Sequence, residues 1–398
     1  MLEVTDDTIL PGIVFHAMVG EQEALRMIQR QEDTEHVTDN MAGKNKPNAV
    51  RDRRVPPTPT KMSSSPVQTI YVLSSSNGLA DHVRRKLKNL DLDIEVKDIP
   101  EKEIHALKDD EVEFAVGQIR QLVAILSRET NKIKWIQCTS AGVDHIFKNI
   151  DHIKPQKDFI MTRTASLDRG QMMGEYCIGH IIARERGFQI WTEAQRRADY
   201  DRKAAPSFRM LRDLTVGFLG VGSLGGEIAR MCRAVGMSVW AGVTDRRFES
   251  GTSPSQEFDH VIPMSRLDDL LKQCDYVVAT LPSTPETRGL LSGDVLQACK
   301  VKQTVLINLG RGDLIDDLSL IKAISNGMLG GAILDVLDQE PLPPDNPLWS
   351  LPNVTITPHI SCQAKNSLDI VAENYVDNVL RYLRGERLQN YVDFNKGY

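Results

Sequence analysis

The sequence lacks the features that mark membrane-spanning or nucleic-acid-binding chains. No apolar run reaches the length of about 18 residues that a transmembrane helix needs, so none is expected. No basic stripe accompanies the net charge of -6, which argues against a nucleic-acid surface or a polybasic membrane patch. What remains is a chain of 398 residues, 41% of them hydrophobic, typical of a globular protein with two or three domains.

The cysteines show no pairing pattern either. They lie scattered with no C-x-x-C pair, at Cys138, Cys177, Cys232, Cys274, Cys299 and Cys362. This spacing favours buried free thiols in a reducing compartment over a disulfide framework or a zinc site. We therefore expect a cytoplasmic protein without a metal ion.

Residues 1–66 differ in composition from the rest of the chain. Acidic residues come first, and the stretch GKNKPNAVRDRRVPPTPTKMSSSP is rich in proline, serine and charge. Such a segment has little to bury, so we predict a flexible N-terminal extension with one short helix around EQEALRMIQRQ. The apolar stretch ILPGIVFHAMV has no basic flank, which argues against a signal peptide, and the acidic residues argue against a transit peptide.

From residue 68 onward, short apolar segments alternate with amphipathic ones. The strands are predicted at residues 68–73, 93–96, 113–116, 134–139, 214–220, 238–243, 275–282, 303–310, 331–337 and 353–358, and the helices at 79–90, 223–236, 265–273, 293–299, 316–327 and 366–386. Gly236 and Gly327 stand where glycines end helices. Continuous apolar strands alternating with helices indicate parallel sheets covered on both faces, an α/β fold.

A glycine-rich loop follows the strand at 214–220. Gly220, Gly222 and Gly225 have the G-x-G-x-x-G spacing, and an amphipathic helix and a second strand come next. In that context the glycines permit a tight turn, close approach of a pyrophosphate and close helix–strand packing, and helix-start amides near Ser223 and Leu224 face the phosphates. The loop therefore predicts a dinucleotide site, the alternative being a plain turn between strand and helix.

Three charged or titratable residues follow three later strands directly. Arg311, Glu340 and His359 each lie just beyond an apolar segment of one βα series, so they can project into one crevice. Each alone is more often a surface or structural residue, and only their joint placement indicates function. Beside a nicotinamide, His359 can donate a proton to a carbonyl oxygen, Glu340 can fix its tautomer, and Arg311 can grip a carboxylate.

With these motifs the sequence resembles the D-isomer-specific 2-hydroxyacid dehydrogenases over nearly all of residues 68–390. The motifs that carry the resemblance are KWIQCTSAGVD, MGEYCIGHIIARER, ATLPSTPETRGLL, INLGRGDLID, AILDVLDQEPLPPDNPLW and TPHIS. Among relatives, the first motif and EPLPPDNPLW look most like the glyoxylate/hydroxypyruvate reductase branch. Gly310 stands where alanine is common in the family, Leu337 where phenylalanine is usual, and Val243 where NAD-using members carry aspartate.

The resemblance implies a fold, an activity and a set of site residues. The fold is a Rossmann-type doubly wound domain at 165–360, inserted in a smaller flavodoxin-like substrate domain made of 67–164 and 361–398. The active site then lies in the cleft between them. Arg311, Glu340 and His359 are the implied catalytic residues, with the backbone amides of Ser140, Ala141, Gly142 and Val143 holding the substrate carboxylate. The implied cofactor-binding residues include Leu281, Pro282, Leu309, Gly310, Asp335, which meets the carboxamide in the family, His359 and Ser361.

The strand at 238–243 ends in a sequence that bears on cofactor choice. An NAD enzyme places a carboxylate there, which would repel a 2′-phosphate. Here Val243 fills that position, Thr244 and Asp245 follow, and Arg246 and Arg247 come next. Two guanidinium groups suit a phosphate, so we predict NADP(H) as the preferred cofactor, with NAD(H) as the alternative. The competing interpretations are a solvated basic turn, or Asp245 reaching the ribose.

Two expectations concern partners. The helix predicted from about Gly174 to Ala198 has more apolar width than one domain face needs, and the family uses this region for dimer contacts, so a homodimer acting on a small 2-keto or 2-hydroxy acid is expected. The alternative function is a dinucleotide-sensing scaffold, because the C-terminal-binding-protein corepressors resemble this family and retain an Arg/Glu/His set. The extension at 1–66 suits an interaction tail or an upstream start before Met62.

Overall fold

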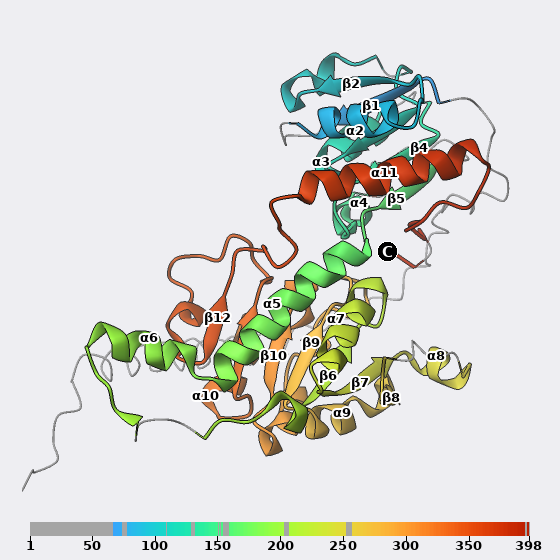
Figure 1. Ribbon diagram of the computed structural model, residues 1–398. Helices are drawn as coiled ribbons and strands as arrows, with labels where there is room; N and C mark the ends of the chain where they lie inside the picture. The colour runs from blue at the N-terminus through green and yellow to red at the C-terminus, as the bar shows by residue number, and fades with distance from the viewer. Residues whose placement is uncertain are drawn as a thin grey trace, which may run out of the picture. The chain divides into compact units, whose positions relative to one another are not determined.

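The computed structural model describes residues 67–73, 78–108, 110–128, 132–149, 151, 153, 159–202, 207–251, 257–394 and 396–397. These residues form two compact units, one comprising 171–362 and the other the described parts of 49–170 and 363–398. Figure 1 shows one parallel sheet with flanking helices in each unit. The N-terminal extension predicted at 1–66, its short helix and Met62 lie outside the described residues.

The smaller unit is built on a five-stranded sheet. Its strands are β1 (Thr69–Leu73), β2 (Glu95–Ile99), β3 (Phe114–Gly117), β4 (Trp135–Cys138) and β5 (Ile160–Arg163), all parallel in the order β2-β1-β3-β4-β5. This is the flavodoxin-like order. Its helices are α2 (Leu79–Lys88), the 3-10 helix η1 (Glu101–Ala106), α3 (Ile119–Leu126), α4 (Asp144–Lys148) and α11 (Ser367–Leu383).

The closing helix α11 covers one face of this sheet through aromatic and polar contacts. Tyr375 stacks on Trp135 with the ring centroids 4.9 Å apart, and Tyr382 meets the edge of Phe114 at 5.2 Å. Beside these rings, Asn378 Nδ2 donates to the buried Gln137 Oε1 at 2.8 Å. Because a buried amide must find its partner, this bond fixes the register of α11 on β4.

The larger unit is built on a seven-stranded sheet. Its strands are β6 (Thr215–Leu219), β7 (Ser238–Val243), β8 (His260–Pro263), β9 (Tyr276–Ala279), β10 (Val305–Asn308), β11 (Gly331–Leu334) and β12 (Val354–Ile356). All pair in parallel in the order β12-β11-β10-β9-β6-β7-β8. The chain order reverses between β6 and β9, which makes their carboxyl ends the switch point where such sheets bind ligands.

Helices cover both faces of this sheet. The helices of this unit are α5 (Leu167–Glu185), α6 (Phe188–Arg196), α7 (Ser223–Ala234), α8 (Asp245–Glu249), α9 (Leu267–Gln273) and α10 (Asp317–Ser325), with 3-10 helices η4 (Leu211–Asp213), η5 (Met264–Arg266), η6 (Val295–Val301), η7 (Gly312–Leu314) and η8 (Pro347–Ser350). The predicted fold class, a Rossmann-type unit inserted in a smaller flavodoxin-like unit, is confirmed. Gly236 (φ 92°) and Gly327 (φ 64°) adopt the left-handed conformation after α7 and α10, as predicted.

Two helix predictions are wrong in detail. The single helix expected from about Gly174 to Ala198 is two, because Gly187 adopts a left-handed conformation (φ 63°) that separates α5 from α6. The helix expected at 293–299 is the 3-10 helix η6. No helix within the described ranges combines the length and the apolar character needed to cross a bilayer.

Candidate active site at the carboxyl ends of the strands

The glycine loop lies at the switch point, between the end of β6 and the start of α7. Gly220 has φ 105°, and a Cβ there would lie 2.7 Å from Thr280 Oγ1. A Cβ on Gly225 would lie 2.0 Å from the carbonyl oxygen of Gly220, whereas one on Gly222 would meet no atom within 4 Å. The first and third glycines are therefore required by packing, and the second leaves open space where backbone can approach a ligand. This cradle fits a dinucleotide pyrophosphate at the start of α7.

Two further predicted residues stand on the other side of the switch point. Leu281 and Pro282 follow β9, and the Thr280 hydroxyl before them donates to the Gly220 carbonyl oxygen at 2.9 Å. Leu309 and Gly310 are buried beyond β10. A Cβ on Gly310 would lie 2.7 Å from the Leu281 carbonyl oxygen, so glycine replaces the alanine common in the family because the backbones approach too closely.

His359 and Glu340 meet, as the sequence predicts. Glu340 follows β11, His359 follows β12, and His359 Nδ1 lies 3.0 Å from Glu340 Oε2. The hydrogen bond to Glu340 raises the pKa of His359, against the opposing effects of burial and of the Arg311 charge. Burial opposes ionisation of Glu340, but the bonds from His359 and from the Leu337 amide (3.0 Å) outweigh it and lower its pKa. Both side chains keep solvent access, with 48% and 40% exposed.

Arg311 belongs to the same cluster. It follows β10, its Nη1 donates to the Gly310 carbonyl oxygen at 2.6 Å, and its own carbonyl accepts from Asn308 Nδ2 at 2.9 Å. Its charge reaches both partners of the pair, because it contributes to lowering the pKa of Glu340 and of His359. The ionisation of Glu340 and of His359 is therefore linked to the charge of Arg311.

Asp335 stabilises the turn that carries His359. Its buried carboxylate accepts from the Thr357 hydroxyl at 2.6 Å and from the amides of Ile360 and Ser361 at 2.8 and 2.9 Å. Its carbonyl oxygen accepts from the His359 amide at 3.0 Å. Burial opposes ionisation, but these hydrogen bonds keep the pKa of Asp335 below its usual value. His359 itself adopts the left-handed conformation (φ 57°), which non-glycine residues rarely do without such support.

Thr357 and Tyr176 are contributors that the sequence interpretation missed. The Tyr176 hydroxyl on α5 lies 2.7 Å from Thr357 Oγ1, so a chain of hydrogen bonds runs from α5 through Thr357 to Asp335. Thr357 was visible as part of the TPHIS motif. Nothing in the sequence marked Tyr176 as part of the site, since it was visible only as one residue of an apolar helix.

The loop after β7 has an acidic and a basic part. Val243 is buried, and the Asp245 carboxylate accepts from the Ser265 hydroxyl at 2.6 Å and the Ser265 amide at 3.2 Å, which lowers its pKa. Thr244 and Arg246 are exposed and Arg247 partly so. Within the described ranges neither guanidinium group has a hydrogen-bond or ion-pair partner. Asp245 is thus engaged while the two arginines remain available.

Ser140, Ala141, Gly142 and Val143 belong to the smaller unit, where they connect β4 to α4. Among the residues that the structure describes, no group of three or more His, Cys, Asp or Glu has the arrangement to hold a metal ion.

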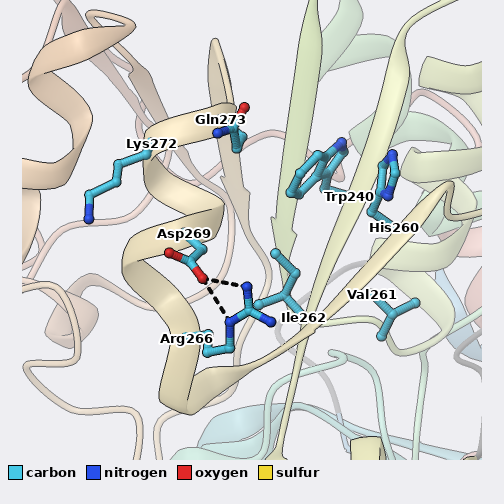
Figure 2. Close-up of a pocket in the computed structure, with 8 residues that line it drawn as sticks. All are labelled: Trp240, His260, Val261, Ile262, Arg266, Asp269, Lys272 and Gln273. Carbon is cyan, nitrogen blue, oxygen red and sulfur yellow. Dashed lines mark hydrogen bonds and ion pairs between the residues drawn. The ribbon is translucent and has the colours of Figure 1, made fainter.

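A hollow of about 420 Å³ lies elsewhere in the larger unit, lined by residues of β7, β8 and α9 (Figure 2). The rings of Trp240 and His260 lie side by side along it with their centroids 4.4 Å apart, and Arg266 is paired with Asp269 at 2.6 Å. It contains none of the predicted site residues, and its arginine is already paired with a carboxylate. The strand ends, with their glycine cradle and charged cluster, are therefore the better candidate for chemistry.

A glycine cradle at the switch point of a doubly wound sheet, with an Arg/Glu/His cluster on the neighbouring strand ends, defines a dinucleotide-dependent oxidoreductase unit. The model of the D-isomer specific 2-hydroxyacid dehydrogenase NAD binding domain matches residues 178–361. A family protein from Aeromonas salmonicida is 31% identical, with a TM-score of 0.71 over 83% of this chain and 100% of that one. The chain belongs to the D-isomer specific 2-hydroxyacid dehydrogenase family, whose members are NAD(P)-dependent enzymes.

Two other solved structures are similar. A D-isomer specific 2-hydroxyacid dehydrogenase from Xanthobacter autotrophicus, in complex with NADPH and MES, is 27% identical, with a TM-score of 0.71 over 83% of this chain and 99% of that one. An NADPH-dependent glyoxylate/hydroxypyruvate reductase from Sinorhizobium meliloti is 24% identical, with a TM-score of 0.69 over 83% of this chain and 100% of that one. The second likeness is one of fold, and the branch within the family stays a prediction.

Proposed function

We propose that the protein reduces a small 2-keto acid of the glyoxylate or hydroxypyruvate type to the D-2-hydroxy acid, with His359 as proton donor. The observation that carries the proposal is the 3.0 Å contact between His359 Nδ1 and Glu340 Oε2 beyond β11 and β12, in the unit that also holds the glycine cradle. When bound in that cradle, the nicotinamide cofactor supplies the hydride. The protein must then deliver a proton to the carbonyl oxygen and hold the substrate.

His359 supplies the proton, and Glu340 holds its ring and its charge. Glu340 occupies Nδ1 and raises the pKa of the ring, so the imidazolium persists and Nε2 is the atom that donates to the carbonyl oxygen. In the oxidation direction the neutral ring accepts the proton at Nε2. The Leu337 amide holds the second oxygen of Glu340, which fixes the carboxylate and through it the ring.

Arg311 and the loop from Ser140 to Val143 hold the substrate in this proposal. The Arg311 guanidinium polarises the carbonyl and binds the carboxylate, since paired N–H donors match both groups. The backbone amides of the loop are the second set of donors to the carboxylate. Asp335 acts by stabilising the His359 turn, which adds a structural role to the carboxamide contact that the family resemblance implies.

We propose NADP(H) as the preferred cofactor. The support is the engagement of Asp245 with Ser265, which leaves Arg246 and Arg247 as the charged groups available at the end of β7. A guanidinium pair suits a 2′-phosphate, and the bonds from Ser265 hold the Asp245 carboxylate in place. The NADPH bound to the Xanthobacter autotrophicus relative agrees with this preference.

We also propose a homodimer that uses the surface of α6. Phe188 and Ile190 are 52% and 48% exposed on this helix, and Met210 nearby in sequence is 52% exposed. When a second copy of the chain covers exposed apolar side chains of this size, their burial lowers the free energy of the assembly. Sedimentation as a monomer at micromolar concentration contradicts the proposal.

We propose a cytoplasmic location as well. The free cysteines, five of them buried, suit the reducing cytoplasm.

A product assay tests the function. Glyoxylate, hydroxypyruvate and phenylpyruvate are offered with NADPH and with NADH, and the configuration of the chiral products is determined. We expect turnover of the two smaller acids, with hydroxypyruvate yielding the D product. Tight dinucleotide binding with no turnover of any 2-keto acid supports the scaffold alternative instead.

A further inference from the structure

The loop between β4 and α4 has an unusual division of its backbone groups. Five consecutive carbonyl oxygens accept hydrogen bonds from side chains or from the chain after β5. Cys138 accepts from Thr164 Oγ1 at 2.9 Å, Thr139 from Arg169 Nη2 at 2.7 Å, Ser140 from the Thr164 amide at 3.1 Å, Ala141 from Arg163 Nη1 at 3.0 Å, and Gly142 from Ser140 Oγ at 2.8 Å. The acceptor side of the loop is thus fully engaged.

The backbone amides of the same loop are only partly engaged. The Thr139 amide bonds to the Gly117 carbonyl at 2.9 Å, and the Ser140 amide interacts with the thiol of Cys138. Among the described residues, the amides of Ala141, Gly142 and Val143 have no acceptor. Peptide carbonyl and amide groups point in opposite directions, so engaging the carbonyls directs the amides outward. Successive amides of this kind form a concave site for an anion.

We propose that Arg163 and Arg169 are positioning residues that hold this loop so that the amides of Ala141, Gly142 and Val143 form a carboxylate-binding site. Arg163 fixes the peptide that carries the Gly142 amide, and Arg169 anchors the Thr139 carbonyl at the start of the loop. This inference rests on the proposed function, because the anion it assigns to the loop is the substrate carboxylate. Arg163 ends β5, and Arg169 lies in the first turn of α5, before residue 171 where the larger unit begins, so both belong to the same unit as the loop. Thr164 between them contributes both its amide and its hydroxyl.

Guanidinium groups suit this task because each donates charge-assisted hydrogen bonds and keeps its proton at every physiological pH. A carbonyl held by such a bond is fixed more firmly than one bonded to water, since the net stabilisation is roughly twice that of a neutral bond. Neither arginine is required to touch the substrate. Each acts through the loop backbone, so its loss affects substrate affinity more than the proton transfer.

Arg128 provides a matched control. It also donates to two backbone carbonyls in this unit, those of Ile104 and Leu107, both at 2.6 Å. It follows α3 and precedes β4, at the opposite end of that strand from the loop. Arg128→Met therefore removes the same kind of bond without changing the loop.

The test measures KM, kcat and inhibition by oxalate for the full chain with NADPH and glyoxylate or hydroxypyruvate. For Arg163→Met and Arg169→Met we expect KM and the oxalate inhibition constant to rise at least about tenfold, the loss from one charge-assisted bond, with kcat changed less. Arg163→Lys and Arg169→Lys keep a charged donor group and are expected to recover most of the affinity. A KM no higher than that of Arg128→Met in both methionine variants overturns the inference.

A second measurement separates this inference from the proposed reaction. Hydrogen exchange of the peptide containing residues 139–143 is followed with and without oxalate. We expect oxalate to slow exchange in the wild type and in Arg128→Met but not in the two arginine-to-methionine variants, even if the wild type turns over no tested 2-keto acid. If oxalate protects the loop in this way but the wild type turns over no tested 2-keto acid, the proposed reaction is wrong and the loop assignment is supported. Absence of protection in the wild type, or equal protection in all variants, overturns the loop assignment.

Discussion

The two units stabilise their functional loops in opposite ways. In the larger unit a carboxylate, that of Asp335, accepts from the amides of Ile360 and Ser361, and the turn presents a side chain, His359. In the smaller unit, guanidinium groups and Thr164 engage the loop carbonyls, and the loop presents backbone amides. The supporting residue thus decides which backbone groups are engaged, because a carboxylate accepts from amides whereas a guanidinium group donates to carbonyls.

The largest expected effect removes the presented side chain itself. His359→Ala deletes the proton donor, so the reduction kcat should fall by ~10²–10⁴-fold. The NADPH dissociation constant, measured by fluorescence titration, should stay within a few-fold, because the glycine cradle is untouched. His260→Ala, in the hollow of Figure 2, is the control and should keep full activity. Unchanged turnover in the His359 variant contradicts the proposed mechanism.

The second-largest effect concerns Arg246 and Arg247 after β7, whose guanidinium groups have no hydrogen-bond or ion-pair partner among the described residues. In the double variant Arg246→Ala/Arg247→Ala, the ratio of kcat/KM for NADPH to that for NADH should fall by about 10²-fold, since two charge-assisted contacts to a 2′-phosphate are lost. The double variant Arg84→Ala/Arg85→Ala on α2 serves as a control with two adjacent surface arginines. A wild type that favours NADH, or a ratio that does not move, shows that this loop does not bind the phosphate.

Glu340→Gln tests how His359 keeps its proton. The wild-type pKa of His359 is raised, chiefly by Glu340, so the imidazolium persists to a higher pH than usual. In the variant that pKa falls. The reduction rate should therefore decline at lower pH than in the wild type, the acid limb of the oxidation profile should also move to lower pH, and kcat should drop by about tenfold. Identical pH profiles for the two proteins would remove Glu340 from this role.

The smallest effect probes the support beneath His359. Thr357→Val removes the hydroxyl that links Tyr176 to Asp335, so the turn loses one hydrogen bond and kcat should fall by about fivefold. Thr357→Ser keeps the hydroxyl and should restore the rate. Equal rates in the valine and serine variants indicate that Asp335 alone holds the turn.

Sequence patterns were sufficient for the long apolar strands and for the residues that follow them. They failed for β5 and β8, which were not predicted, because each has only two adjacent apolar residues, followed by Thr162 and Arg163 in β5 and placed between His260 and Pro263 in β8. Missing β5 also hid Arg163 and Thr164, whose partners are carbonyl oxygens. Any residue supplies a carbonyl, so such bonds leave no signature in the sequence.

The interruption at Gly187 was missed for a different reason. Apolar residues continue on both sides of it, so the pattern resembles one long helix, whereas the left-handed glycine ends α5 and starts α6 in a new direction. The Asp335 network was likewise beyond sequence reasoning. It depends on a buried carboxylate meeting amides that are 25 and 26 positions away.

Gly310 has a consequence for engineering. Consensus substitution, which replaces an unusual residue by the one most common in its family, would put alanine at this position. The added methyl group would lie 2.7 Å from the carbonyl oxygen and 2.9 Å from the nitrogen of Leu281, closer than a carbon atom can approach backbone atoms. The substitution is therefore expected to displace the ends of β9 and β10 and to harm the protein rather than stabilise it. Residues 281 and 310 must be redesigned together.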